Sequence, residues 1–176
     1  MAVISVKKIV LTVCLSLIGI FWLCCFLPPQ LSASLNKADK VLVIKSKRVL
    51  MLLSRGDIIR TYKVALGKQP TGRKMRAGDK RTPEGTYILD SRNADSRFHL
   101  ALHISYPNES DVLSAHKRGV TPGGDIMIHG LPADLARVGK LHRLSDWTNG
   151  CIAVTNPEIE EIWRLVPDGT PIEIKP

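Results

Sequence analysis

Residues 41–66, VLVIKSKRVLMLLSRGDIIRTYKVAL, decide the fold that we predict for this chain. Three runs rich in Val, Ile and Leu follow one another at 41–44, 49–53 and 58–66. The short links between them carry the polar and glycine residues that are typical of turns. Consecutive strands joined by such short links pair with their sequence neighbours, so this stretch predicts a three-stranded antiparallel meander.

The remainder of the chain also favours strands over helices. Further strands are expected at 86–89, 98–104, 125–129 and 170–174, and long polar loops at 67–83 and 107–124. One helix is indicated, because Asn156 is a suitable N-cap, Pro157 fits the first helical position, and apolar residues then recur at helical spacing. We therefore expect a mainly β fold with one clear short helix, and loops that are long enough to carry a site.

The N-terminus predicts a membrane segment. An apolar run from Ile9 to Leu27 follows Lys7 and Lys8. This run is close to the length of about 20 residues that spans a bilayer as a helix, and the lysines favour a cytoplasmic N-terminus. A small-residue site at 32–34 would suit a signal peptidase, but the run is longer than the apolar core of a usual signal peptide, which favours a retained anchor.

Three parts of the chain follow from this pattern. We expect a signal anchor or signal peptide at 1–29, a polar tether at 30–39 and one folded domain at 40–176. The folded domain would lie outside the cytoplasm. A retained anchor would hold it at the periplasmic face of a bacterial inner membrane, and cleavage would release it into the periplasm.

The net charge of +9 suits several kinds of anionic partner, among them nucleic acid, a lipid surface and an acidic wall polymer. The densest basic group falls in the 68–81 loop, which contains no aromatic residue on which a base could stack. We therefore expect no nucleic-acid partner, and a positive field from a solvated loop. The sequence indicates no particular oligomeric state.

Cysteine usage points to residues 146–154, DWTNGCIAV. The other three cysteines, Cys14, Cys24 and Cys25, belong to the N-terminal apolar run, so Cys151 has no partner within the folded domain. An unpaired thiol in an exported protein is open to oxidation, and its presence therefore suggests a chemical role. Gly150 would let a substrate carbonyl approach the main chain, whose N–H groups near Gly150 and Cys151 could form an oxyanion hole.

A thiol with an ordinary pKa of about 8.5 needs a neighbouring base for efficient attack near neutral pH. The leading candidate is His129, which ends the strand expected at 125–129, immediately before Gly130. Metal binding is disfavoured, since His99 and His103 are too far apart along a strand to share an ion. The remaining histidines are at positions 116 and 142.

These residues resemble a known family. The segments IMIHG (126–130) and TNGC (148–151) are similar to the active-site signature of the L,D-transpeptidase catalytic domain, also called YkuD-like. TPEGTY (82–87) and GTPIEI (169–174) resemble two further segments of that family. The likeness covers about residues 40–175, and the ordered set is more specific than any one segment.

The resemblance implies a β-sandwich or mixed sheet, activity on peptidoglycan stem peptides, and no metal or organic cofactor. It also implies that Cys151 is the nucleophile, that His129 is the general base and acid, and that the main-chain carbonyl of Gly130 orients the imidazole. The neighbouring residues of the signature would contribute to the oxyanion and substrate sites: Thr148, Asn149 and Gly150.

Two positions depart from the family pattern. Many relatives have a second histidine where Asn149 stands, and an arginine or asparagine where Ala153 stands. Arg143, shortly before the cysteine block, is a candidate for binding a substrate carboxylate in their place, and a plain surface role is the alternative.

The expected function is that of a membrane-tethered, periplasm-facing cysteine acyltransferase, an L,D-transpeptidase. Residues 104–108, Asp111 and residues 146–147 suggest a subgroup that includes enzymes cleaving cross-links rather than forming them. A hydrolytic L,D-carboxypeptidase or amidase on the same scaffold is therefore the first alternative. A non-catalytic wall-binding module is the second.

Overall fold

The structure is a computed structural model that describes residues 37–176. The predicted anchor or signal peptide and most of the predicted tether lie outside the described residues. Between residues 37 and 176 the structure has no helix with the length and apolar character needed to cross a membrane.

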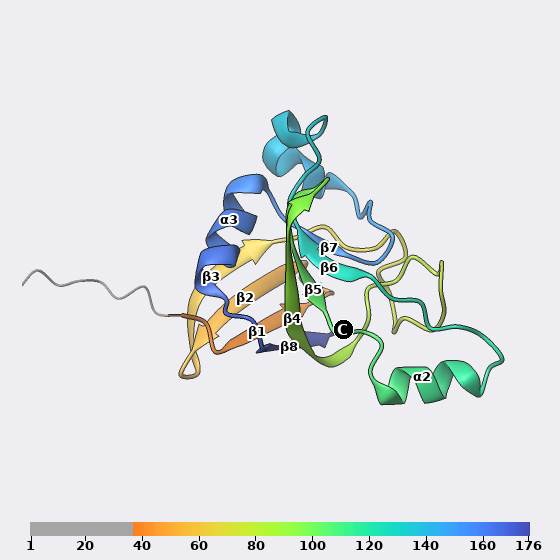
Figure 1. The fold of residues 1–176 in the computed structure, drawn as a ribbon. Coiled ribbons are helices and arrows are strands. Elements are labelled where there is room, and N and C mark those ends of the chain that lie inside the picture. The colour runs from red at the N-terminus through yellow and green to blue at the C-terminus, as the bar shows by residue number, and fades with distance from the viewer. Residues whose placement is uncertain (1–36) are drawn as a thin grey trace, which may run out of the picture. The chain divides into compact units, whose positions relative to one another are not determined.

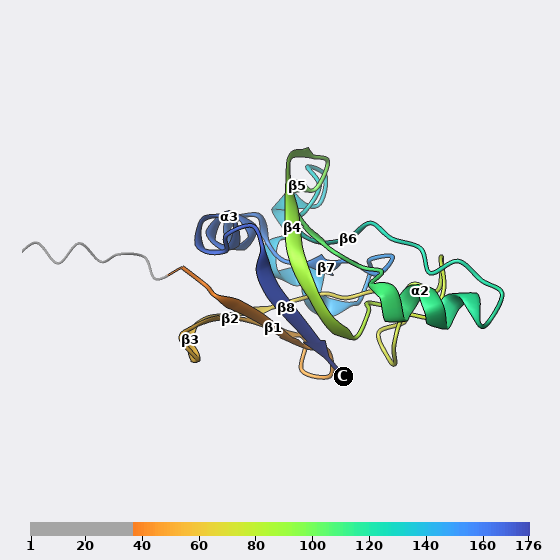
Figure 2. The same cartoon turned by 60° about the horizontal axis from the view of Figure 1, so that its bottom comes forward.

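A single mixed sheet of eight strands forms the framework (Figures 1 and 2). The strands are β1 (Lys40–Ile44), β2 (Val49–Ser54), β3 (Asp57–Lys63), β4 (Gly85–Ser96), β5 (His99–Ile104), β6 (Ile126–His129), β7 (Ile152–Ala153) and β8 (Thr170–Lys175). Their order across the sheet is β3-β2-β1-β8-β4-β5-β6-β7. The β1–β8 and β6–β7 pairs are parallel, and the other neighbours are antiparallel.

The meander predicted from residues 41–66 is confirmed, because β1, β2 and β3 pair in antiparallel order. Alternation along β1 and β2 sends one set of side chains into the core, where Val43 lies opposite Leu50. Both turns contain an arginine with a left-handed backbone, Arg48 at φ 48° and Arg55 at φ 54°.

The two edges of the sheet meet. After β3 the chain continues to Ala65, which exchanges two main-chain hydrogen bonds with Ala153 of β7, at 3.0 and 2.9 Å. Two residues after Ala65, Gly67 bridges to Thr148. The sheet is therefore curled, and the short strand β7 has a hydrogen-bonded neighbour on both sides.

Helix α3 (Asn156–Leu165) packs an apolar face into the core through Ile159, Ile162 and Leu165, all fully or almost fully buried. The helix was predicted, but its N-cap is Thr155 rather than Asn156. The Glu158 carboxylate accepts hydrogen bonds from the N–H and hydroxyl groups of Thr155, at 2.9 and 2.7 Å. The Asn156 side chain instead accepts a hydrogen bond from the Leu131 N–H.

The expectation of a single helix was incomplete. Residues 107–124, predicted as loop, contain helix α2 (Glu109–His116), which begins with a capping box between Asn108 and Asp111. A 3₁₀ segment, η1 (Ala136–Leu144), connects β6 to the cysteine block and is interrupted at Gly139. α2 lacks a strong apolar stripe, and Val112 and Leu113 are exposed, so helical periodicity could not reveal it.

Candidate active site

Cys151 and His129 line the same groove at the ends of β6 and β7. The two strands are parallel, with Ile128 opposite Ile152 and His129 opposite Ala153. Cys151 comes two residues before Ala153, and residues two apart along a strand point to the same face. The register therefore places the thiol and the imidazole on one face of the sheet, in the wall of one cavity of about 420 Å³. We call this cavity the histidine groove.

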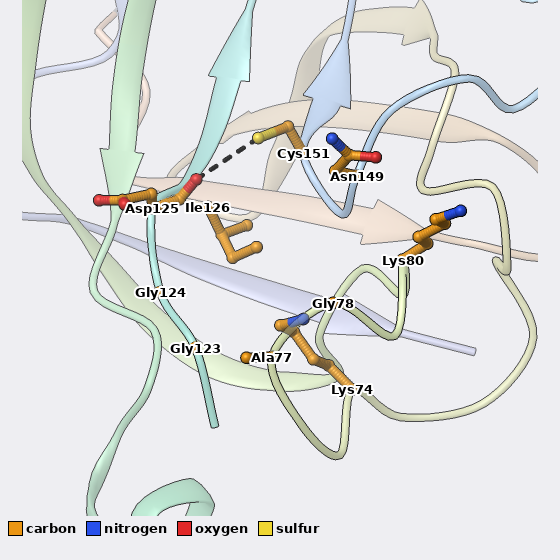
Figure 3. Close-up of a pocket in the computed structure, with 10 residues that line it drawn as sticks. All are labelled: Lys74, Ala77, Gly78, Lys80, Gly123, Gly124, Asp125, Ile126, Asn149 and Cys151. Atoms are coloured by element: carbon orange, nitrogen blue, oxygen red, sulfur yellow. Dashed lines mark hydrogen bonds between the residues drawn. The ribbon is translucent and has the colours of Figure 1, made fainter. Parts of the chain in front are cut away.

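The Cys151 thiol is the free cysteine of the described residues. Its Sγ atom donates a hydrogen bond to the main-chain oxygen of Asp125 at 3.5 Å (Figure 3). Burial raises the pKa of the Cys151 thiol, and the negative charge of Asp125 acts in the same direction. A main-chain hydrogen bond from Met127 and the charge of Lys74 oppose this rise without cancelling it. The Cys151 thiol is therefore neutral at neutral pH.

The His129 imidazole is fixed by its neighbour in sequence. Its Nδ1 atom lies 2.7 Å from the main-chain oxygen of Gly130. A carbonyl oxygen can only accept, so this contact assigns the proton to Nδ1 and leaves Nε2 free to act as a base. Burial lowers the pKa of His129 below the ordinary histidine value, so the ring is neutral at neutral pH.

Only glycine fits at position 130. A Cβ atom there would lie 2.6 Å from Asn156 Oδ1 and 2.9 Å from the main-chain oxygen of Phe98. The same Asn156 oxygen accepts a hydrogen bond of 2.6 Å from the Leu131 N–H. The start of α3 therefore packs directly against the main chain that orients the imidazole.

Aromatic side chains surround the imidazole. The Phe98 ring lies 4.5 Å from the His129 ring, and the Trp147 ring meets His129 edge-on at 5.8 Å, both measured between centroids. Trp147 also donates a hydrogen bond to Nδ1 of His142 at 3.4 Å. These contacts restrict the rotation of the imidazole and keep water from its faces.

The turn before the nucleophile uses the Thr148 hydroxyl twice. It donates to the main-chain oxygen of Cys151 at 2.7 Å and accepts from the Gly150 N–H at 3.1 Å. Gly150 has φ 135°, and a Cβ there would lie 2.8 Å from the Arg81 oxygen. Thr148 therefore shapes the turn, and the Gly150 N–H already has an acceptor. Asn149 is exposed and lines the groove.

Arg143 lies away from the groove lining. Its guanidinium donates to the Glu158 carboxylate, at the start of α3. Burial alone would raise the pKa of Glu158, but hydrogen bonds from Arg143 and Thr155 hold it below the usual value. In this structure Arg143 links η1 to α3.

A second cavity, of about 470 Å³, lies on the other side of Cys151 (Figure 3). We call it the loop groove, because the 74–80 part of the long basic loop forms one wall and residues 123–125 form another. Asp125, Asn149 and Cys151 line both grooves. The Cys151 thiol therefore lies between two cavities.

Buried ion pairs hold the basic loop in place. The Lys74 ammonium lies 2.8 Å from the Asp79 carboxylate, which also accepts hydrogen bonds from main-chain N–H groups of the loop. The Lys45 ammonium, almost fully buried, donates to Glu84 and to the main-chain oxygens of Gly72 and Thr82. The loop is thus a preorganised wall, although most of its residues are exposed, as expected from its composition.

Three groove residues were not predicted as site residues: Lys68, Arg97 and Phe98. Lys68 was expected only as part of the basic loop, Phe98 only as a strand residue, and Arg97 was not considered. The sequence signal of Arg97 and Phe98 was weak, because the β4–β5 hairpin brings them to the groove through its pairing with β6. No group of three or more His, Cys, Asp or Glu side chains in residues 37–176 is placed to hold a metal ion.

The sequence model of the YkuD family, the L,D-transpeptidase catalytic domain, matches residues 38–174. The chain belongs to this family. The match extends over the whole curled sheet and includes both Cys151 and His129.

Two of the similar proteins come from Escherichia coli and Campylobacter jejuni. The "Putative L,D-transpeptidase YafK" of Escherichia coli (strain K12) is 30% identical over 130 residues, which cover 70% of this chain and 45% of that protein. The helical cell shape determining protein Pgp2 of Campylobacter jejuni is 28% identical, with a TM-score of 0.60 over 78% of this chain and 47% of that one.

A third similar structure is Bd1075 of Bdellovibrio bacteriovorus. It is 28% identical, with a TM-score of 0.57 over 79% of this chain and 48% of that chain. The chain therefore spans about half the length of the relatives it matches, and the shared part is the L,D-transpeptidase domain.

Proposed function

We propose that this protein is a cysteine acyltransferase acting on peptidoglycan stem peptides. The observation that carries the proposal is the shared groove of Cys151 and His129, with the Nδ1 proton of His129 held on the Gly130 oxygen. Membership of the L,D-transpeptidase family supports the substrate class. The likeness to a cell shape determining protein supports it further.

The first half of the reaction is acylation. Nε2 of His129 takes the proton of the Cys151 thiol as the sulfur attacks the carbonyl carbon of the scissile amide, which is joined to a D-amino acid. The tetrahedral intermediate collapses, the C–N bond breaks, and the imidazolium returns the proton to the departing amine. The acyl group then remains on Cys151 as a thioester.

The second half is deacylation. An amine from another stem peptide loses its proton to Nε2 as it attacks the thioester, the C–S bond breaks, and the thiolate regains a proton from the imidazolium. The product is an L,D cross-link. The loop groove, which reaches Cys151 from the other side, offers room for this acceptor. If water attacks in its place, the same steps give hydrolysis.

Proton transfer coupled to attack suits the charges of this site. Burial raises the pKa of Cys151 and lowers that of His129, so both shifts favour the neutral pair over a thiolate–imidazolium pair. The nucleophile is then formed only when a substrate carbonyl is in place. A thiol that is neutral at rest is also less open to oxidation.

We further propose that residues 9–27 anchor the protein at the periplasmic face of the inner membrane, consistent with the apolar run and its preceding lysines. Fractionation should recover it with the membrane, and the intact mass of the exported protein should correspond to the uncleaved chain. Recovery in the cytosol would overturn the proposal. A mass lacking the N-terminal residues would replace the anchor with a signal peptide.

Purified protein incubated with muropeptides tests the function, with products identified by mass spectrometry. New dimers indicate transfer, whereas shortened or released peptides indicate hydrolysis. Cys151→Ala and His129→Gln should abolish either product. His116→Gln is the matched control, because His116 is exposed at the end of α2 and lines neither groove. Products that persist with Cys151→Ala would disprove cysteine catalysis.

A further inference from the structure

Two cations at the rim of the histidine groove have no acidic partner among residues 37–176. They are Lys68 and Arg97, both exposed and both part of the groove lining. Several other basic side chains near the two grooves are neutralised. The neutralised pairs are Arg48–Asp146, Arg73–Asp111, Lys74–Asp79 and Arg143–Glu158.

Arg97 is positioned by stacking. Its guanidinium carbon lies 4.8 Å from the centre of the Phe98 ring, and the Phe98 ring lies 4.5 Å from the ring of His129. Stacking holds the guanidinium plane while leaving its N–H donors free, because none of them has a hydrogen-bond acceptor within the described part of the chain. The charge is therefore presented beside the proposed base.

Lys68 is positioned by its main chain. Its N–H donates to the main-chain oxygen of Thr148 at 3.0 Å, three residues before the nucleophile. The main chain of Lys68 is thus tied to the same turn that carries Cys151, and its exposed side chain belongs to the groove lining. The acidic residue of this groove lining is Asp125. It forms no ion pair with Lys68, Arg97 or any other described residue, and its main-chain oxygen accepts the hydrogen bond from the Cys151 thiol.

We propose that Arg97, assisted by Lys68, binds a free carboxylate of the substrate next to the scissile amide. An exposed guanidinium with free, preorganised donors matches a carboxylate in a bidentate geometry. Arg143, which the sequence suggested for carboxylate binding, forms an ion pair with Glu158 instead. The inference rests on the proposed function and deepens it, since it requires a substrate with a negative charge at this point.

A stem peptide offers this carboxylate from two sources. One is the C-terminal carboxylate of the residue that leaves, and the other is the carboxylate on the diacid residue that becomes the acyl group. Both have the same chemistry, so the groove alone does not distinguish them. Three synthetic peptides separate the sources: the free acid, its C-terminal amide, and the form amidated on the diacid.

The test measures kcat/KM for each peptide with wild type, Arg97→Gln, Arg97→Lys and Lys68→Gln. Loss of a charge-assisted hydrogen bond corresponds to roughly a tenfold to hundredfold drop, which we expect for Arg97→Gln on the free acid. Arg97→Lys should recover part of the loss, and Lys68→Gln should cause a smaller one. On the peptide that lacks the recognised carboxylate, wild type and Arg97→Gln should differ by less than about threefold.

Arg55→Gln is the matched control, because Arg55 sits in the β2–β3 turn and lines neither groove. It should retain wild-type kcat/KM on every peptide. An Arg97→Gln loss of equal size on all three peptides would overturn the proposal, as would no loss on any. Equal melting temperatures of the variants would show that the differences do not come from unfolding.

Binding separates failure of this inference from failure of the proposed function. Calorimetry with Cys151→Ala measures peptide affinity without any reaction. We expect the free acid to bind more tightly than one of the two amides, and the difference to vanish in Cys151→Ala/Arg97→Gln. If the wild type processes no peptide but this pattern is seen, the carboxylate site stands and the proposed reaction falls. Equal affinity for all three peptides overturns the carboxylate site whatever the turnover.

Discussion

Nδ1 of His129 lies 2.7 Å from the main-chain oxygen of Gly130, the next residue in the chain. Many histidine bases are oriented by a carboxylate, whose negative charge favours the imidazolium. Here a neutral carbonyl selects the tautomer without adding charge. Burial keeps the pKa of His129 low, although the hydrogen bond to Gly130 acts in the opposite direction. The orientation of the imidazole depends on a glycine with no space for a side chain.

Gly130→Ala should reduce both activity and stability. The added Cβ would meet Asn156 Oδ1 at 2.6 Å and the Phe98 oxygen at 2.9 Å, so the main chain that orients the imidazole must move. We expect at least a tenfold loss of kcat and about 1–3 kcal/mol of lost stability, measured by muropeptide turnover and by denaturant unfolding. Gly124→Ala is the stability control, because its nearest contact would be at 3.9 Å. Equal stability of the two variants would refute the packing explanation.

The reactivity of Cys151 should depend on pH as that of a neutral thiol does. Since burial raises the pKa of Cys151, alkylation by iodoacetamide should keep accelerating above the pH at which an ordinary thiol ionises. A thiolate–imidazolium pair would instead give a rate that is already at its plateau near pH 7. Alkylation rates measured from pH 5 to pH 10 distinguish a neutral thiol from a thiolate–imidazolium pair. His129→Gln should leave the rise of the alkylation rate at alkaline pH unchanged.

Acid should destabilise the domain through buried histidines. Burial lowers the pKa of His142 to about 4, and it also lowers that of His129. The unfolded chain takes up these protons near its ordinary pKa of about 6.5, whereas the folded chain resists them. Stability from the neutral rings is thus complete above about pH 6.5 and is lost as the pH falls toward 4.

The check is the free energy of unfolding between pH 7 and pH 4. At 1.36 kcal/mol for each pKa unit, His142 alone accounts for a loss on the order of 3 kcal/mol. His142→Gln should flatten the decline, and the exposed His116→Gln should not. Parallel curves for wild type and His142→Gln would show that His142 plays no part.

The buried ion pair of the basic loop should matter more than a surface pair. The Lys45 side chain is 3% exposed and donates to Glu84 and two main-chain oxygens. Lys45→Met leaves these acceptors buried without a partner, so we expect a loss of about 3 kcal/mol or more. Lys40→Met, which breaks the exposed Lys40–Glu173 pair, should cost under about 1 kcal/mol. Similar losses from the two changes, seen in urea unfolding, would contradict this ranking.

Arg143 and Glu158 should behave as one unit. Because Arg143 links η1 to α3 through Glu158, Arg143→Gln and Glu158→Gln should lower the melting temperature alike, and the double variant should lower it little further. Substrate binding by Arg143 predicts a different result. In that case Arg143→Gln would raise KM while Glu158→Gln would leave it unchanged.

Short-range sequence patterns predicted the strands and the helix whose burial pattern shows within a short segment. The meander of residues 41–66 and helix α3 were predicted because period-two runs and helical spacing report burial within a short segment. The N-cap was displaced by one residue because Glu158 offered Thr155 two hydrogen bonds. α2 was missed because only its capping box, Asn108 and Asp111, marks it as a helix.

The site required tertiary information beyond its two central residues. The unpaired thiol, the histidine at a strand end and the family resemblance together suggested Cys151 and His129, but nothing in their spacing gives the parallel pairing of β6 with β7. Arg97 and Phe98 reach the groove through a hairpin, β4–β5, that begins a long way earlier in the sequence. Arg143 was suggested by its proximity in sequence to Cys151, and the fold turned it toward α3 instead.

The Ala65–Ala153 hydrogen bonds make the site around Cys151 depend on closure of the sheet. β7 has only two residues, yet it is held on both sides, by β6 and by the segment after β3. Its amide protons should therefore exchange with solvent only when the edges of the sheet separate, an event close to global unfolding. The arrangement of Cys151 beside His129 therefore exists only in molecules whose curled sheet is closed.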